Sequence, residues 1–433
     1  MSFLKVLGFD PAKHNVKTEI VAGITTFLTM AYILAVNPDI FGALEGMGMP
    51  KGAVFTATAL AAIVGTLVMS LYAKKPYALA PGLGLNAFFV YTVCLTMGYS
   101  WQFALTAVLI EGIIFIILTV TNVREAIINA IPKSMKSAVS AGIGLFIAFI
   151  GMVNAGIIVD DGGTIISLGT ITSGPALLAI VGLVITSVMM ILKVPGAMLI
   201  GIIVTAVIGI PFGITKFDGV VSSVPSVAPI FWKFEFHNIL SWDMLIVVFT
   251  FLFIDMFDTI GTVIGVSKKA NTMNPDGTIP GVKKVLMADA VATVWGAICG
   301  TSTTTTYVES ASGVAEGGRT GLTSFTTAVC FAIALFFAPL FIGIPSAATA
   351  PALIIVGVMM MSSILDVDFN DFSESIPAYI CMIVMPLAYS ISDGIMLGMI
   401  SFVVLNALTG KFKKISVMMW ILAILFVLRY IFL

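Results

Sequence analysis

Long apolar runs follow one another along almost the whole of this 433-residue chain. A helix needs about 20 predominantly apolar residues to cross the hydrocarbon core of a bilayer, and many of these runs have about that length. The composition agrees, because 59 % of the residues are hydrophobic and 10 % are charged, against about 45–50 % and about 25 % in soluble domains. The sequence therefore predicts an all-α polytopic membrane protein.

The predicted spans are separated by short polar loops. The apolar segments are 20–42, 53–73, 101–120, 137–158, 175–192, 196–213, 244–266, 285–300, 321–343, 348–365, 376–391, 394–409 and 415–433. Two further stretches, 78–97 and 301–316, are shorter and rich in Gly, Ser, Thr and Pro, which indicates broken spans.

Loop charges indicate the orientation of the chain. Lys and Arg gather in loops that all lie on the cytoplasmic side if the N-terminus is cytoplasmic; Lys193 and the group Lys411, Lys413 and Lys414 are examples. The loop 366–374 belongs to the same side but is acidic. The last run, 415–433, fits either an extra span or an interfacial helix.

Two carboxylates interrupt the apolar run 244–266. Asp255 and Asp258 lie three residues apart, so both face one side of a helix about one turn from each other. Each acid costs about 2.5–3.5 kcal/mol at the bilayer centre on insertion scales, so such residues usually serve a substrate, ion or proton path. Hydrogen bonds that serve helix packing alone are the alternative. The pair therefore favours transport.

An internal repeat relates the two halves of the chain. Residues 57–68 resemble residues 288–299, and the broken segments that follow keep step, with Tyr77 opposite Tyr307. Seven spans in each half is an odd number, so the second copy starts on the opposite side of the membrane. Inverted repeats with matching broken segments are typical of secondary transporters, whose substrate site lies where the breaks meet. Chance similarity between apolar runs is the alternative.

The two broken segments carry polar side chains. In APGLGLN, Pro81 suits a first helical turn, the glycines allow close approach, and Asn86 offers both donors and an acceptor. In GTSTTTTYVES, the threonines favour an extended stretch and Glu309 begins the next helix, where capping alone could explain it. Glu111, within the fourth span, is a weaker candidate.

Four stretches resemble the AzgA-like branch of the nucleobase permeases, which take up adenine, guanine and hypoxanthine. They are NPDIFGALEGMGMP (37–50), APGLGLNAFF (80–89), FLFIDMFDTIGT (251–262) and GTSTTTTYVESASGVAEGGRTGLTS (300–324). The resemblance covers nearly the whole chain. It implies two inverted seven-span repeats, with short antiparallel β segments in broken spans three and ten, and a core domain that moves against a gate domain. Many members form homodimers through the gate.

The resemblance also divides the chain into domains. The expected ranges are a cytoplasmic arm at 1–19, core spans 1–4 at 20–120, gate spans 5–7 at 137–213, core spans 8–11 at 244–343, gate spans 12–14 at 348–409, and a basic segment with an apolar helix at 410–433.

Carried over residue by residue, the family's substrate-binding positions fall on Asn86, Asp255 and Glu309. Asp258 matches the second acid of the eighth span, which is implicated in proton coupling, so Asp258 or Glu309 is expected to carry the proton. Carboxylates and an amide suit the N–H groups and acceptors at the edge of a purine. Candidates to stack on the base or line its site are Phe88, Phe257, Thr306 and Tyr307.

Other classes of protein fit less well. A net charge of −1 without a basic stripe speaks against nucleic-acid partners, and the sequence suggests no metal site or cofactor. An anion transporter or channel would meet repulsion from three acids, a membrane enzyme would need a nucleophile with a base, and a pyrimidine or xanthine permease is the nearest rival. We expect a proton symporter that imports adenine, guanine or hypoxanthine across a bacterial cytoplasmic membrane.

Overall fold

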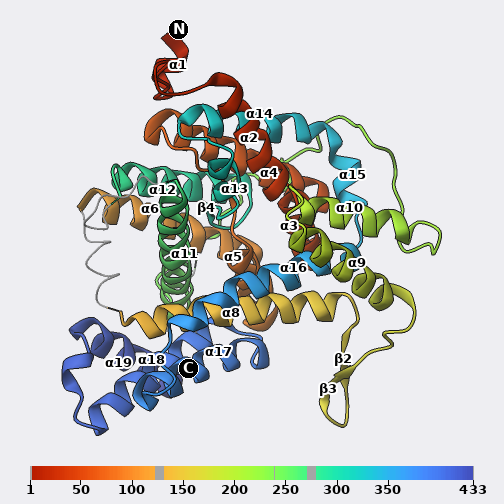
Figure 1. Ribbon diagram of the computed structural model, residues 1–433. Coiled ribbons are helices and arrows are strands. Elements are labelled where there is room, and N and C mark those ends of the chain that lie inside the picture. The colour runs from red at the N-terminus through yellow and green to blue at the C-terminus, as the bar shows by residue number, and fades with distance from the viewer. Residues whose placement is uncertain (1, 122–130, 238, 271–278, 433) are drawn as a thin grey trace.

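The computed structural model describes residues 2–121, 131–237, 239–270 and 279–432, which form a helical bundle with short strand pairs (Figure 1). The elements of the first half are α1 (Ser2–Val6), α2 (Val16–Met30), α3 (Ile33–Phe41), α4 (Lys51–Val68), β1 (Leu79–Pro81), α5 (Leu83–Ala87), α6 (Trp101–Thr121), α8 (Lys133–Asn154), β2 (Ile158–Asp161), β3 (Ile165–Leu168), α9 (Gly174–Ile191) and α10 (Ala197–Gly209). The elements of the second half are α11 (Trp242–Lys269), α12 (Val282–Cys299), β4 (Thr304–Thr306), α13 (Ser310–Ala315), α14 (Gly321–Ala334), α15 (Ala338–Ile342), α16 (Ser346–Met361), α17 (Phe372–Leu387), α18 (Ile391–Leu408) and α19 (Val417–Phe432).

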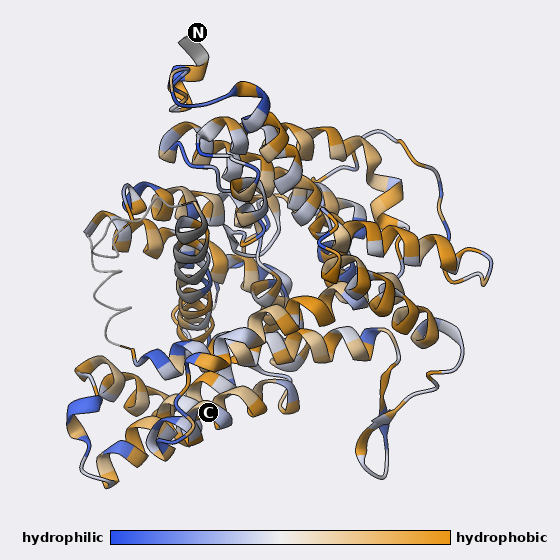
Figure 2. Ribbon diagram, in the orientation of Figure 1, coloured by the Kyte–Doolittle hydropathy of each residue, from blue (hydrophilic) through white to orange (hydrophobic). Residues whose placement is uncertain are grey.

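The described residues contain 8 helical stretches that are long and apolar enough to cross a membrane. Hydrophobic residues dominate most of the helices (Figure 2). The first of these stretches begins at Val16, because the side chain of Asn15 accepts hydrogen bonds from the first backbone N–H groups and caps α2. This helix includes the last residues of the arm expected at 1–19, and the boundary of the arm stays a prediction. The chain is a multi-pass membrane protein.

The two broken spans cross as an antiparallel strand pair, which confirms the predicted β segments. Leu79 of β1 lies opposite Thr306 of β4, and Pro81 lies opposite Thr304. Threonine favours extended backbone, and Pro81, which has no N–H to donate, is tolerated because each strand of a two-stranded sheet is an edge strand. Pairing is required here, since an unpaired backbone group inside the membrane costs several kcal/mol.

Helices that are distant in the sequence pack side by side. The helix α8 packs against α16 and α17, and α9 packs against α10 and α16. In the other part of the bundle, α12 packs against α4 and α6, and α14 packs against α2 and α4. Figure 1 shows α8 and α16 running next to each other below the crossing of the broken spans.

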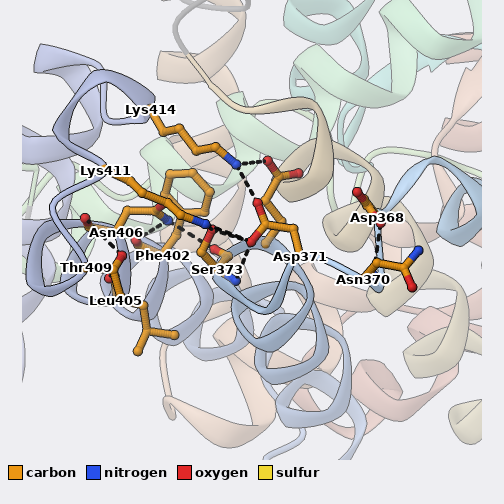
Figure 3. Close-up of polar contacts among 11 residues, drawn as sticks. Asp368, Asn370, Asp371, Ser373, Phe402, Leu405, Asn406, Thr409, Lys411 and Lys414 are labelled. Atoms are coloured by element: carbon orange, nitrogen blue, oxygen red, sulfur yellow. Dashed lines mark hydrogen bonds and ion pairs between the residues drawn. The ribbon is translucent and has the colours of Figure 1, made fainter.

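The acidic loop before α17 meets lysines from two other loops that were predicted on the same side. The Nζ atom of Lys133 lies 2.6 Å from Asp366, and those of Lys411 and Lys414 lie 3.0 and 2.7 Å from Asp371 (Figure 3). These ion pairs explain why an acidic loop can share a side with basic ones. The three loops lie together at one end of the bundle.

The last helix, α19, lies antiparallel to α18. It starts just after the loop that carries Lys414, near the end of α18, and its last turn reaches Asp393 at the start of α18. There Arg429 lies 3.2 Å from Asp393, and the hydroxyl of Tyr430 donates to the same carboxylate at 2.7 Å. Of the two roles left open for this run, the packing along α18 favours an additional span.

Candidate substrate site

A cavity of about 90 Å³ lies beside the crossing of the broken spans. One wall is polar and comes from the α2–α3 turn, the start of α5, α11 and the segment after β4. Its polar side chains are Tyr32, Asp258, Thr262, Thr306, Tyr307 and Glu309. The facing wall comes from α8 and α16 and is apolar apart from Ser140. Carboxylates that face an apolar surface suit a flat, neutral ligand with N–H donors.

Four of the predicted site residues line this cavity. Asp258 and Glu309, the two candidates for the proton, both contribute carboxylates, and Thr306 and Tyr307 lie between them on the wall. Asp258 also interacts electrostatically with Glu309. The residues therefore converge on the cavity from α11 and from the segment between β4 and α13.

Glu309 is held by a residue that the sequence analysis missed. The hydroxyl of Tyr32 donates a hydrogen bond to Oε1 of Glu309 at 2.7 Å. Tyr32 is 1 % exposed and lies in the turn between α2 and α3. Nothing in its apolar sequence surroundings distinguishes this tyrosine from a packing residue.

Asn86 and Phe88 lie behind the cavity wall. The amide oxygen of Asn86 accepts from Ser302, and its nitrogen donates to the carbonyl of Pro81 at 3.5 Å. The hydroxyl of Tyr307 donates to the same carbonyl at 2.6 Å. The ring of Phe88 packs edge-on against Phe251. Asn86 therefore braces the crossing of the broken spans in this structure, and its role as a substrate ligand stays a prediction.

Asp255 belongs to a buried polar cluster next to the cavity. The hydroxyl of Thr259 lies 3.1 Å from Asp255, 2.9 Å from Asp289 and 2.7 Å from the hydroxyl of Thr305. Asp289 also accepts from the backbone N–H of Thr306 at 2.9 Å. This cluster fixes β4 against α11 and α12, and the substrate-binding role of Asp255 stays a prediction.

Glu111 and Phe257 are the two predicted residues that remain. Glu111 is buried and accepts from the hydroxyl of Thr303 at 2.5 Å, so it ties α6 to the second broken span. The side chain of Phe257 lies outside the described part of the structure. Asp289 was missed, although a lone acid in the apolar run 285–300 is the same signal that singled out the acids of the eighth span.

A larger cavity of about 600 Å³ adjoins the first one, and Glu309 lines both. Its walls come from α2, the loop between α9 and α10, α13 and α16. Along α13 it is lined by Glu309, Ser312 and Glu316, whose spacing places them on one side of the helix. Lys193 lies in the wall from the α9–α10 loop. We call this space the vestibule.

Away from the vestibule, polar contacts join α3 and the first broken span to the neighbouring helices. Asp39 of α3 accepts from Ser346 at 2.7 Å and from Thr349 at 2.6 Å, both on α16. The amide of Asn154, at the end of α8, donates to the hydroxyl of Tyr91 at 3.0 Å. These contacts tie the helices together at this end of the bundle, next to a cavity of about 410 Å³ that Lys51 and Pro345 line.

Comparison with known proteins shows the family to which the chain belongs. The profile of the permease family matches residues 17–397. The chain is 45 % identical over 434 residues to the guanine/hypoxanthine permease PbuG of Bacillus subtilis, with 98 % of each covered. It is 41 % identical over 417 residues to the adenine permease AdeQ of Escherichia coli, covering 96 % of this chain and 93 % of that protein.

Among solved structures, the transmembrane domain of a cyanobacterium bicarbonate transporter, BicA, has a TM-score of 0.66 at 16 % identity, covering 89 % of this chain and 97 % of that one. Such low identity shows a shared fold alone. The match to the permease family and the relatives named as permeases show a membrane transporter, not an enzyme. The chain belongs to the permease family, and its relatives confirm the resemblance to the AzgA-like purine nucleobase permeases.

Proposed function

We propose that this protein imports purine nucleobases together with protons. The observation that carries the proposal is the cavity at the crossing of the broken spans, whose polar wall contains Asp258 and Glu309. Relatives at 45 % and 41 % identity are named for guanine, hypoxanthine and adenine. These bases are flat and carry N–H groups that carboxylates can accept.

The proposed binding roles follow the geometry. Glu309 accepts the N–H groups of the base, and Thr306 and Tyr307 line its site. Asn86 and Asp255 are also proposed as substrate residues. They lie directly behind the cavity wall, where their hydrogen bonds hold the broken spans and α11 in place. An anion, by contrast, would meet two carboxylates in the cavity, which disfavours the bicarbonate chemistry named for BicA.

Asp258 and Glu309 are the proposed proton carriers. Glu309 touches both the substrate cavity and the vestibule, so a proton on its carboxylate can reach either space. One charge that moves through 100 mV is worth about 2.3 kcal/mol, which supports about a fifty-fold substrate gradient. Proton symport can therefore concentrate a neutral base that diffusion alone would only equilibrate.

We further propose a core domain and a gate domain built from inverted repeats. The packing supports this proposal because it is mirrored between the halves: α9 packs on α10 and contacts α16, and α17 packs on α18 and contacts α8. The cavity has one wall from the proposed core and one from the proposed gate. A movement of the core against the gate would therefore open or close it.

The arrangement of cavities supports alternating access with the site open towards the cytoplasm. If the N-terminus is cytoplasmic, the vestibule lined by Thr25 and Thr29 of α2 lies on the inner side of the cavity. The contacts of Asp39 with Ser346 and Thr349 then lie on the outer side and close it. A bacterial cytoplasmic membrane and a homodimer through the gate complete the proposal by analogy with the family.

Uptake of labelled adenine, guanine and hypoxanthine into purine-transport-deficient cells tests the proposal. The native protein is compared with Glu309→Gln and with Glu45→Gln, an exposed glutamate outside the cavity, with and without a protonophore. We expect protonophore-sensitive uptake of at least one base by the native protein and by Glu45→Gln, and loss of uptake by Glu309→Gln. A well-expressed native protein that takes up none of the three bases would overturn the purine assignment.

A further inference from the structure

We infer that Tyr32 is a positioning residue that orients the Glu309 carboxylate for the substrate. This inference rests on the proposed function. It is carried by the hydrogen bond from the Tyr32 hydroxyl to Oε1 of Glu309, 2.7 Å long and formed between two residues of the cavity wall.

The hydroxyl of Tyr32 restricts how the carboxylate can turn. A carboxylate accepts hydrogen bonds through two oxygens, and a bond to a charged acceptor is about twice as strong as one between neutral groups. With Oε1 held by Tyr32, Oε2 keeps a fixed direction in which an N–H group of the base can be accepted. Tyrosine achieves this without adding a charge to a site that already contains two acids.

Close backbone packing makes the pairing rigid. Glu309 stands at the start of α13, which packs against α2, the helix directly before Tyr32. A Cβ atom added at Gly313 of α13 would lie 2.4 Å from the carbonyl oxygen of Ala22 and 2.1 Å from the hydroxyl of Thr26, so the two backbones are in close contact. Helix packing therefore fixes the separation of the backbones that carry Tyr32 and Glu309.

The second tyrosine of the cavity shows that the contact is particular to Tyr32. The hydroxyl of Tyr307 donates to the carbonyl of Pro81 and so serves the crossing of the broken spans. Of these two tyrosines, both in the polar wall, only Tyr32 donates to the Glu309 carboxylate. The two hydroxyls therefore have separate roles, one for architecture and one for the substrate-binding acid.

The test compares Tyr32→Phe with Tyr379→Phe, which removes the hydroxyl of an exposed tyrosine on α17. Initial uptake rates of the transported purine, normalised to the amount of protein in the membrane, give KM and Vmax for each variant. For Tyr32→Phe we expect KM to rise about ten-fold or more, the size of a lost bond to a charged group, while Vmax stays close to native. Tyr379→Phe should match the native protein.

Competition by N-methylated purines provides a readout that a merely structural role would not change. The native protein should discriminate against a purine whose N–H is blocked, and Tyr32→Phe should discriminate less, because its carboxylate is no longer fixed. An unchanged KM and unchanged discrimination in Tyr32→Phe would overturn the inference, as would failure of this variant alone to reach the membrane. Absence of purine uptake by the native protein would instead contradict the proposed function, so the two failures are distinct.

Discussion

At the scale of single residues, the structure separates the two acids of the eighth span. Asp258 lines the cavity, whereas Asp255 joins the buried cluster with Thr259 and Asp289. We predict that Asp258→Asn abolishes protonophore-sensitive accumulation, because an amide cannot carry the proton, while the exchange of labelled for unlabelled base continues. Uptake and counterflow in vesicles measure the two activities.

The control for this prediction is Asp160→Asn, an exposed aspartate in the strand β2, which should accumulate substrate like the native protein. Accumulation by Asp258→Asn against a gradient, with undiminished dependence on external pH, would assign the proton to another group.

Sequence reasoning predicted only some of the side chains that line the cavity. The spacing of Asp255 and Asp258 indicates a common side of the helix, but two positions three apart differ by about 60° around the axis, and only the packing of α11 decides which of them meets the cavity. Glu309 was found because it stands in a broken span. Tyr32 was missed because its partner lies in another span, and a sequence pattern does not show contacts between distant segments.

At the scale of elements, ion pairs join the loop before α17 to the loop that carries Lys411 and Lys414. Hydrogen bonds from Lys414, Ser373 and Lys411 hold the pKa of Asp371 well below its usual range, and the bond to Asp371 raises the pKa of Lys414. A carboxyl group whose pKa is lowered by folding stabilises the fold above its unfolded pKa of about 3.9. It loses this effect as the pH falls through its pKa in the folded protein. A lysine whose pKa is raised by folding stabilises the fold below its unfolded pKa of about 10.4. It loses this effect as the pH rises through its pKa in the folded protein.

We therefore predict that Asp371→Ala lowers the unfolding temperature by a constant amount between about pH 5 and about pH 9, where both charges are present. Thermal unfolding of the purified protein over a series of pH values measures the effect. Asp368→Ala is the matched control, since Asp368 lies in the same loop and contacts Asn370 apart from the lysines (Figure 3). If the difference in unfolding temperature between Asp371→Ala and the native protein vanished at neutral pH, the ion pairs would not have the predicted stabilising role.

The elements themselves were largely predictable, because apolar length and helix-breaking residues act locally. The broken spans and their strand pairing followed from Pro81, the neighbouring glycines and the threonines of β4. The bend of the first span at Ala31–Tyr32 was not predicted, since no Pro or Gly marks it. The position of α19 was left open because length alone does not distinguish a span from an interfacial helix, and only the contacts at Asp393 show that it runs along α18.

At the scale of the whole molecule, the contacts of Asp39 and the vestibule lie at opposite ends of α16. Asp39 supplies a charged acceptor to two hydroxyls across the boundary between the proposed core and gate. In the proposed alternating access, these bonds favour the conformation with an open vestibule and break when the outer side opens. Their loss should therefore shift the population towards the outward-open conformation.

We predict that Asp39→Ala shifts the equilibrium between the open and the closed vestibule about ten-fold towards the closed state, the order expected when bonds to a charged acceptor are lost, and so lowers the accessibility of the vestibule. Ser312→Cys, in a background without Cys94, Cys299, Cys330 and Cys381, reports accessibility through its rate of labelling by an impermeant thiol reagent in inside-out vesicles. The hydroxyl of Thr349 can still donate to the carbonyl of Ser346, so Thr349 keeps an acceptor in the variant.

The control for the prediction on Asp39 is Ser363→Ala, which removes a hydroxyl bonded to the carbonyl of Ser137 at 3.0 Å. Both of those residues belong to the proposed gate, so this loss should leave the vestibule as accessible as before. Equal labelling of Ser312→Cys in the Asp39→Ala and native backgrounds would show that Asp39 does not bias the conformation. Slower labelling in Asp39→Ala alone would mean that the outer contacts set the balance between the two conformations, because a residue far from the vestibule can change its accessibility only through such a balance.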